Sequence, residues 1–242
     1  MVLARHLYMR MMRRGRALSL LALASVPGLV YWLAAFDAGT GETEELYSSI
    51  VSTVGFTYAI AALIITVATL REERDAGTLP HIYMRPMPRL WLAASALAAG
   101  VGAALVIGVG GWLVMLLAAL AVGADVSVAF SGLALFVAAA VGYSAVFVPV
   151  GYLVPRAIFA GLGYIVVIES IVASAVSGLS QFSIWRIALS IYADLAPRVG
   201  MEAEEMLGAV KAGAGGGVVK IVGVTVVGLA GLTWALRRRD AL

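Results

Sequence analysis

The sequence has no cysteine and few charged residues. Without cysteine the chain forms no disulfide, holds no thiolate-bound metal and has no cysteine nucleophile. Charged residues make up 13% of the 242 residues, whereas a soluble domain has about 25%. Hydrophobic residues make up 62%, and the mean hydropathy is +0.98. These values exclude an ordinary soluble domain and indicate a polytopic membrane protein.

Motifs for catalysis and for nucleotide binding are also lacking. Gly213–Gly217 is rich in glycine, but no Gly-Lys-Ser/Thr follows it and no strand precedes it, so it is not a phosphate loop. No Gly-x-Ser-x-Gly or paired His-Glu motif supports hydrolysis. His6 and His81 have no second ligand at metal spacing and are predicted to be ordinary surface histidines. The sequence therefore predicts no enzyme, no metal site and no cofactor in this chain.

The chain does contain long apolar runs, each able to form a helix that crosses the ~30 Å hydrocarbon core of a bilayer. We expect six transmembrane helices in one all-α domain, residues 1–242. The third run is too long for one straight span, and Gly108, Gly110 and Gly111 near its middle predict a kink, tilt or break there. The predicted spans are about 17–36, 48–70, 91–122, 131–154, 157–176 and 218–236.

The basic residues predict the orientation of these spans. Thirteen of the seventeen lie in residues 1–16, in residues 71–89, at Arg156 or in the tail 237–239. By the positive-inside rule the N- and C-termini and residues 71–90 are then cytoplasmic, and Asp37–Leu46, a short acidic loop, lies outside. Residues 1–16 are basic and amphipathic. We interpret them as an interfacial helix rather than a cleaved signal peptide, because the apolar run behind them is long enough to span.

The polar stretch between the second and third runs, residues 71–90, has more organisation than a plain connecting loop needs. It begins with the charged run Arg71–Asp75. Thr78 is predicted to be the N-cap of a short helix, and Pro86 ends that helix because the residue before a proline is pushed out of the α region. One face of the helix is apolar and comprises Leu79, Ile82 and Tyr83.

Residues 73–79 and 86–89 resemble the cytoplasmic coupling loop of permease subunits of type 2 (ABC-2) ABC exporters. There, an acidic–basic–acidic run precedes Gly-Thr-Leu and a Pro-x-x-Arg follows. The resemblance implies a coupling helix that docks on a separate ATPase subunit, which binds ATP and Mg²⁺. The matching residues are Glu73, Asp75, Gly77, Thr78, Leu79, Ile82, Tyr83, Pro86 and Arg89. The alternative is a loop made basic by the positive-inside rule alone.

On that resemblance, the chain is expected to be the permease subunit of an ATP-driven exporter in the plasma membrane. The implied partners are an ABC ATPase subunit, a second permease copy in a homo- or heterodimer, and membrane lipid. The basic residues gather at one membrane face, so nucleic acid is not an expected partner.

Two polar features lie within the predicted spans. Ser49, Thr53 and Thr57 are spaced i, i+4 and are predicted to form a hydroxyl stripe that faces other helices. Glu169 is the only clear ionisable residue in a span, and burying a charge there is costly. We predict that these four residues contribute to a translocation path. The alternatives are a protonated Glu169 bonded to a neighbouring helix, such as the stripe, or a proton carrier in a secondary transporter.

The outer segment, residues 178–217, is predicted to contain short interfacial or re-entrant helices, as such exporters do; the alternative is a solvated loop. An apolar stripe alternates with a polar face, and Pro197 ends this helix. Glu202–Ala212 is expected to form a second helix, and Gly213–Gly217 a flexible joint. The stripe comprises Phe182, Trp185, Leu189 and Tyr192, and the polar face Ser183, Arg186, Ser190 and Asp194.

Overall fold

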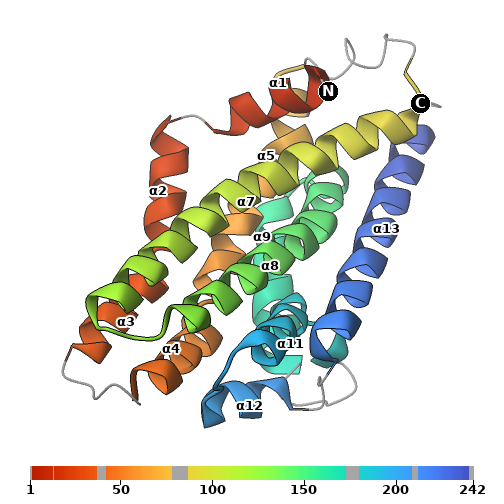
Figure 1. Ribbon diagram of the computed structural model, residues 1–242. Coiled ribbons are helices and arrows are strands. Elements are labelled where there is room, and N and C mark those ends of the chain that lie inside the picture. Colours follow the sequence, from red (N-terminus) through yellow and green to blue (C-terminus); the bar gives the residue numbers. More distant parts are fainter. Residues whose placement is uncertain are drawn as a thin grey trace.

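The computed structural model describes residues 2–12, 14–36, 42–77, 87–172, 180–208 and 212–239. Helices make up 88% of the structure, and the described ranges contain no strand. The all-α fold class predicted from the apolar runs is therefore confirmed. Figure 1 shows an elongated bundle in which the first and last helices reach the same end.

The N-terminal region forms three short helices, α1 (Val2–Met11), α2 (Arg14–Ala24) and α3 (Val26–Ala35). Figure 1 shows α1 turned away from the direction of α2 and α3, so α1 is a helix separate from the first span. Leu7 and Met11 are fully buried because α1 packs against α7 and α5. Residues 15–35 are long and apolar enough to form the first span.

The second predicted span is bent rather than straight. It consists of α4 (Glu42–Thr53) and α5 (Thr57–Asp75), which are inclined by 42° to each other. Gly55 lies at the break, where a Cβ atom would come within 2.5 Å of the Trp185 ring. The prediction of a loop through Leu46 was wrong for residues 42–46, which are helical. The rest of that loop, residues 37–41, lies outside the described residues.

The next two helices are the longest, α7 (Arg89–Ala121) and α8 (Val126–Leu153). No break occurs near Gly108–Gly111: α7 is one helix of 33 residues, about 50 Å long by the helix rise. Its glycines permit close packing instead, since a Cβ on Gly111 would lie 2.4 Å from the Ala24 carbonyl oxygen. A helix of this length exceeds the ~30 Å hydrocarbon core and must tilt to remain within it.

The predicted fifth span, residues 157–176, is described only as far as Val172. It comprises α9 (Ala157–Gly163) and η1 (Tyr164–Val172), a π-helical segment, and residues 173–179 lie outside the described part. These 16 residues would extend only about 24 Å even at the α-helical rise.

The outer segment is mostly helical and packed. It contains η2 (Ser180–Phe182), α11 (Ile184–Leu195) and α12 (Met201–Leu207), which is shorter than predicted. Residues 184–192 are all buried, because α11 packs between α8 and α13 and α12 covers its far end. Helix α11 is therefore neither a solvated loop nor a surface helix with one face in water, whereas α12 buries only Ala203 and Leu207. Phe182 is the exception in the apolar stripe, being exposed.

The last helix, α13 (Gly213–Arg239), starts earlier than expected. Residues 213–217 are its first turn and a half, so the prediction of a flexible joint was wrong. The carboxylate of Asp194 accepts a hydrogen bond of 2.8 Å from the Ala214 backbone N–H and so satisfies one free donor of that turn.

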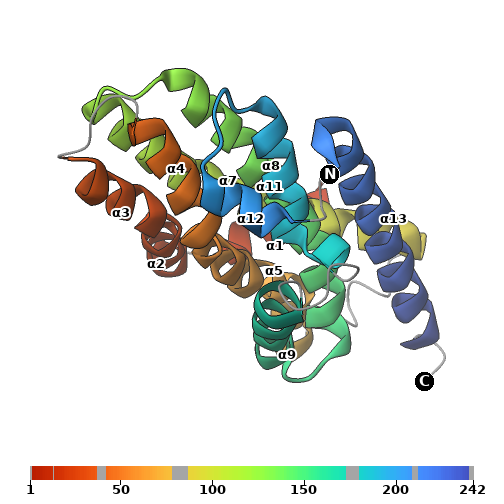
Figure 2. The same cartoon turned by 90° about the horizontal axis from the view of Figure 1, so that it is seen from below.

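Helix α8 is the centre of the bundle and contacts α5, α7, α11 and α13. A line of aromatic rings crosses it: Tyr58 and Phe136 have centroids 5.3 Å apart, and Phe136 and Trp185 are 6.5 Å apart. The polar tips are paired, since Tyr58 donates to the Ala104 carbonyl and Trp185 to the Ser52 carbonyl. Figure 2 shows α9 and α13 at the periphery, away from this core.

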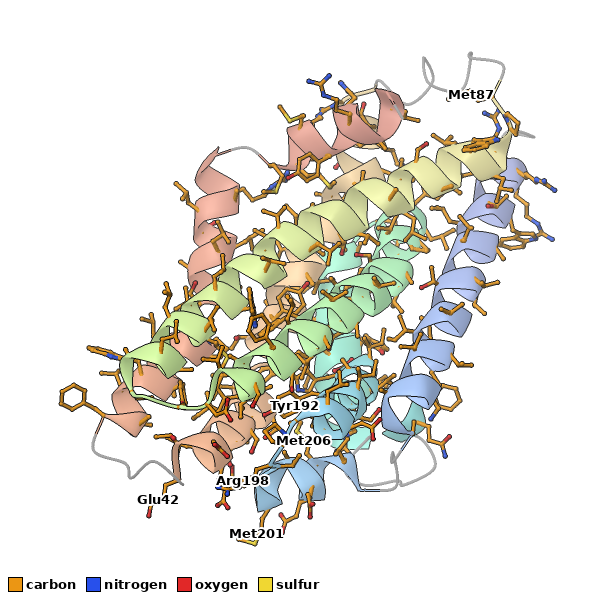
Figure 3. All side chains as sticks on the ribbon, in the orientation of Figure 1. Glu42, Met87, Tyr192, Arg198, Met201 and Met206 are labelled. Carbon is orange, nitrogen blue, oxygen red and sulfur yellow. The ribbon has the colours of Figure 1, made fainter. Side chains whose placement is uncertain are left out.

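Within the described residues, four helices are long and apolar enough to span a membrane, and a fifth span results if α4 and α5 count as one. Six spans and their orientation are therefore not confirmed. The ends of the bundle are nevertheless distinct. Figure 3 places Met87 at the end where α1 begins, and Glu42, Arg198 and Met201 at the opposite end. There Arg198 pairs with Glu44 at 3.5 Å and joins the outer segment to α4.

Candidate functional site

An ion-pair cluster joins the N-terminal helices to the end of α5, directly before the predicted coupling loop. Glu73 has 2% of its side chain exposed, and its Oε1 atom lies 2.7 Å from Arg10 Nη1. His6 Nε2 lies 3.5 Å from the same oxygen. Glu72 is paired with Arg16, which also donates to the Met11 carbonyl at 3.0 Å. We call these five residues the α1–α5 ion-pair cluster: His6, Arg10, Arg16, Glu72 and Glu73.

A second set of contacts joins the same end of α5 to α8. Arg74 Nη1 donates to the Tyr152 carbonyl at 3.3 Å, and Arg71 pairs with Asp75 one turn later, also at 3.3 Å. The charged run therefore connects α5 with α1, α2 and α8 at once. Any force applied at the C-terminus of α5 would reach all three helices through these contacts.

The structure separates the predicted partner-contact residues into three groups. Glu73 is buried inside the chain and cannot touch a partner in this arrangement. Asp75 has 65% of its side chain exposed, Gly77 is exposed with a φ of 67°, and Arg89 begins α7. The others lie outside the described residues: Thr78, Leu79, Ile82, Tyr83 and Pro86.

Glu169 is the buried acid of the π-helical segment η1. Its Oε2 atom accepts a hydrogen bond of 2.7 Å from the Tyr143 hydroxyl of α8, while Oε1 is buried and has no hydrogen-bond partner among the described residues. The Tyr143 ring stacks on Phe147 at 5.5 Å, and Phe147 meets the Tyr164 ring edge-on at 5.8 Å. The Glu169 carboxylate is therefore held against α8 by one short hydrogen bond from Tyr143, whose ring packs in turn against Phe147.

The N-terminus of α11 lies beside the same acid. The backbone N–H groups of Ile184 and Trp185, in the first turn of α11, lie close to the Glu169 carboxylate. Ser183 caps this helix by accepting from the Arg186 backbone N–H at 3.1 Å. The Arg186 guanidinium is within electrostatic range of Glu169, and its buried Nε atom has no hydrogen-bond partner in the described part.

The hydroxyl stripe does not join Glu169. Ser49 and Thr53 belong to α4, whereas Thr57 begins α5 beyond the bend, so the i, i+4 stack is interrupted. The Thr53 hydroxyl donates to the Ser49 carbonyl at 2.6 Å, and Thr53 is exposed. The predicted partner of Glu169 on the second span is thus replaced by Tyr143 on the fourth.

Sequence reasoning missed the partners in both regions. The sequence predicts Arg10 and Arg16 only as part of a basic interfacial helix, and it does not single out Tyr143. One signal was available: two adjacent acids, Glu72 and Glu73, next to a predicted span require basic partners, and residues 1–16 are the nearest basic segment. No comparable signal distinguishes Tyr143 from the other tyrosines of the chain.

Comparison with models of known protein families identifies a related family. Residues 12–179 match the model of a protein family described as ABC-2 family transporter protein. The matched range runs from the end of α1 to beyond η1 and includes the predicted coupling loop and Glu169. No curated protein matches the chain.

Proposed function

This chain belongs to the ABC-2 transporter family, and we propose on that premise that it is the permease subunit of an ATP-driven exporter in the plasma membrane. The family and the apolar helices make it a transport component within a membrane. In the proposal, a separate ATPase subunit binds ATP and Mg²⁺ and hydrolyses the nucleotide. Family membership favours this proposal over a proton-coupled secondary transporter.

The observation that carries the proposal is the α1–α5 ion-pair cluster. The chain enters the predicted coupling loop from α5 and leaves it into α7, and both of these helices contact α1. A loop that only connected two spans would not need a buried acid such as Glu73 to hold the preceding helix to Arg10. The cluster supports a mechanical role for this end of the bundle.

The proposed mechanism follows from these contacts. Closure of the ATPase subunits on ATP would displace the segment between Gly77 and Arg89. Because α5 is tied to α1 and α2 through Glu72 and Glu73, and to α8 through Arg74, the displacement would move these helices together. Two permease copies would then alternate between inward and outward access. In this scheme Asp75, Gly77 and Arg89 contact the ATPase, and Glu73 transmits the motion within the chain.

For Glu169, the geometry supports a role in holding η1 against α8 and α11. A π-helical turn is less stable than an α-helical one and needs outside contacts to persist. The bond from Tyr143 and the first turn of α11 supply such contacts. Contact with a cationic substrate is the second candidate role, because Oε1 has no hydrogen-bond partner in the described residues.

Site-specific cross-linking tests the ATPase contact directly, since the chain has no cysteine of its own. Asp75→Cys at the exposed end of α5 should form a cross-link to a co-expressed ABC ATPase. Glu202→Cys is the matched control, because Glu202 is equally exposed but lies on α12 at the opposite end of the bundle. Cross-linking at Glu202→Cys and not at Asp75→Cys would refute the proposal.

Transport measurements test the coupling. The double variant Asp75→Ala with Ile82→Asp should insert into the membrane normally. In proteoliposomes that contain the ATPase subunit it should still allow ATP hydrolysis but no longer transport. Glu73→Ala should also lower the stability of the folded chain, because the Glu73 carboxylate is buried, so it does not test the ATPase contact alone. Normal transport by Asp75→Ala with Ile82→Asp would contradict the assignment of this loop.

A further inference from the structure

An apolar groove with a volume of about 590 Å³ lies between α8 and α13, with η2 and α11 at its side. Pro149 and Leu153 of α8 form one wall. Gly223, Val227 and Gly231 of α13 form the other; they are spaced i, i+4, i+8 and so share one helix face. The volume is within the range of ~300–1,000 Å³ that holds small-molecule ligands.

The groove opens to the side of the bundle. Only 22% of the most apolar part of α13 is buried, and Val227 is 71% exposed. A Cβ atom added at Gly223 or at Gly231 would have no neighbour within 4 Å. In a membrane protein this side faces hydrocarbon, so the groove is accessible from within the bilayer rather than from water.

One end of the groove is polar and cationic. Lys220 is the first α13 residue on the groove and is half-buried, and Gln181 of η2 is the second polar residue of its lining. No ion pair involves Lys220 within the described part of the chain. A lysine at the end of an apolar groove in a membrane needs water or an anion as its partner.

The distance between the two ends matches one leaflet of a bilayer. Lys220 and Gly231 are eleven residues apart, which is about 16 Å by the helix rise. Half of the hydrocarbon core is about 15 Å. A chain that starts at Lys220 and follows Gly223, Val227 and Gly231 would therefore reach about as far as the bilayer midplane.

From this geometry we propose that the α8–α13 groove binds an anionic phospholipid of the surrounding bilayer. Its phosphate is bound by the Lys220 ammonium and by the Gln181 amide, and one acyl chain lies along Gly223 and Val227. The bound chain fills the gap between α8 and α13 and stabilises the packing of α13. The binding is independent of ATP and of the ATPase, so this inference goes beyond the proposed function.

A second copy of this chain fits the groove less well. A symmetric contact would place the same face of each subunit against the other and would enclose both Lys220 residues in one apolar interface. Between Gly213 and Arg239, α13 carries no acidic residue to pair with them. The charge on the groove therefore favours a phosphate over another α13.

Photo-cross-linking of the full chain in vesicles tests the proposal. The probes are photoactivatable phosphatidylglycerol and phosphatidylcholine, each in a phosphatidylcholine bilayer, and the adducts are mapped by peptide mass spectrometry. We expect adducts on α8 and α13 at Leu153, Val227 or their neighbours. One lysine near the membrane surface should favour the anionic probe about fivefold. Equal labelling of this groove by both probes in the unmodified chain would overturn the proposal.

Two variants locate the phosphate. Lys220→Gln should reduce labelling of the groove by phosphatidylglycerol to the phosphatidylcholine level, and Lys220→Arg should retain the preference. The matched control carries Lys220→Gln together with Val219→Lys; it restores the net charge but places it on the exposed face beside the groove. Recovery of the preference in this double variant would show that the groove does not select the phosphate and would refute the assignment.

Two further variants locate the acyl chain. Gly223→Leu fills the open groove without a clash and should abolish labelling by both probes, whereas Val222→Leu adds volume on the exposed face outside it and should not. Size-exclusion chromatography of the same samples reports the oligomeric state. If Gly223→Leu changed that state and left lipid labelling intact, the groove would be an interface between copies, and the lipid proposal would be wrong.

Discussion

The ion pair between Arg10 and Glu73 allows a quantitative test of how the bundle end is held together. The Glu73 side chain is 2% exposed and that of Arg10 is 30% exposed, so the pair is largely shielded from water. Arg10→Met keeps most of the apolar stem of the side chain and removes the guanidinium, with its charge and its hydrogen bonds to Glu73 and to the Glu72 carbonyl. Removing one partner of a buried pair leaves a buried charge and costs about 3 kcal/mol in the free energy of unfolding.

Two other ion pairs in the same region, both more exposed to water, provide a comparison for the cost of losing the Arg10–Glu73 pair. Arg16 and Glu72 are 25% and 31% exposed, so Arg16→Met should cost about 1 kcal/mol. Arg71 and Asp75 are 32% and 65% exposed and lie one turn apart, so Arg71→Met should cost only about 0.3 kcal/mol. The predicted order of destabilisation is therefore Arg10→Met, then Arg16→Met, then Arg71→Met.

The assay is reversible unfolding of the full chain in mixed micelles by titration with sodium dodecyl sulfate. A double-mutant cycle with Arg10→Met and Glu73→Gln separates the pair from other effects, and the expected coupling is about 2 kcal/mol. A coupling no larger than that of Arg71 and Asp75 would refute the view that this cluster holds α1 to α5.

Three further predictions concern the core, the buried acid and a helix cap. Gly111→Ala should cost about 2 kcal/mol in unfolding free energy because its Cβ would lie 2.4 Å from a carbonyl oxygen, whereas Gly102→Ala, with its nearest neighbour at 3.7 Å, should not destabilise. Tyr143→Phe should cost about 1 kcal/mol by removing the bond to Glu169, and Glu169→Gln less, both measured in the same titration. Hydrogen bonds from Ser127 lower the pKa of Asp125, so its stabilisation of α8 is present above pH ~3.9 and lost below it; Asp125→Asn should remove that pH dependence.

Much of the organisation could be predicted from local sequence patterns. Helix α11 ends before Pro197, and α8 ends at Leu153, one residue before the predicted end of the fourth span, although it begins at Val126 rather than at residue 131. These features depend on residues within one or two turns of each other. Partners far apart in the chain could not be predicted in this way: Arg10 and Glu73 are 63 residues apart, and their contact depends on how α1 folds back over α5 and α7.

Glycine shows why one observation left three outcomes open for the third span, a kink, a tilt or a break, of which the break does not occur. Glycine weakens an isolated helix, so a cluster of glycines near the middle of a long run predicts a break. In a bundle the same residues let backbones approach, and that gain depends on a neighbour that the local sequence does not reveal. For Gly111 the neighbour is Ala24, on a helix nearly ninety residues earlier. The bend occurs instead between α4 and α5 at Gly55, where the Trp185 ring occupies the space that a Cβ atom would need.

The fifth predicted span, residues 157–176, is not confirmed for a related reason, and its geometry bears on Glu169. Hydropathy counts apolar residues but assumes that each adds one α-helical step, whereas Tyr164–Val172 forms π-helical turns that are wider and shorter. Those turns place Glu169 toward Tyr143 and the start of α11, so the acid is enclosed by protein. In the structure Phe159 and Val166 are exposed on the outside of the bundle. A regular α-helix through Tyr164–Val172 would point the Glu169 side chain in a different direction relative to α8. The π-helical geometry and the buried acid therefore explain each other: the hydrogen bond stabilises the turn, and the turn directs the carboxylate to its donor.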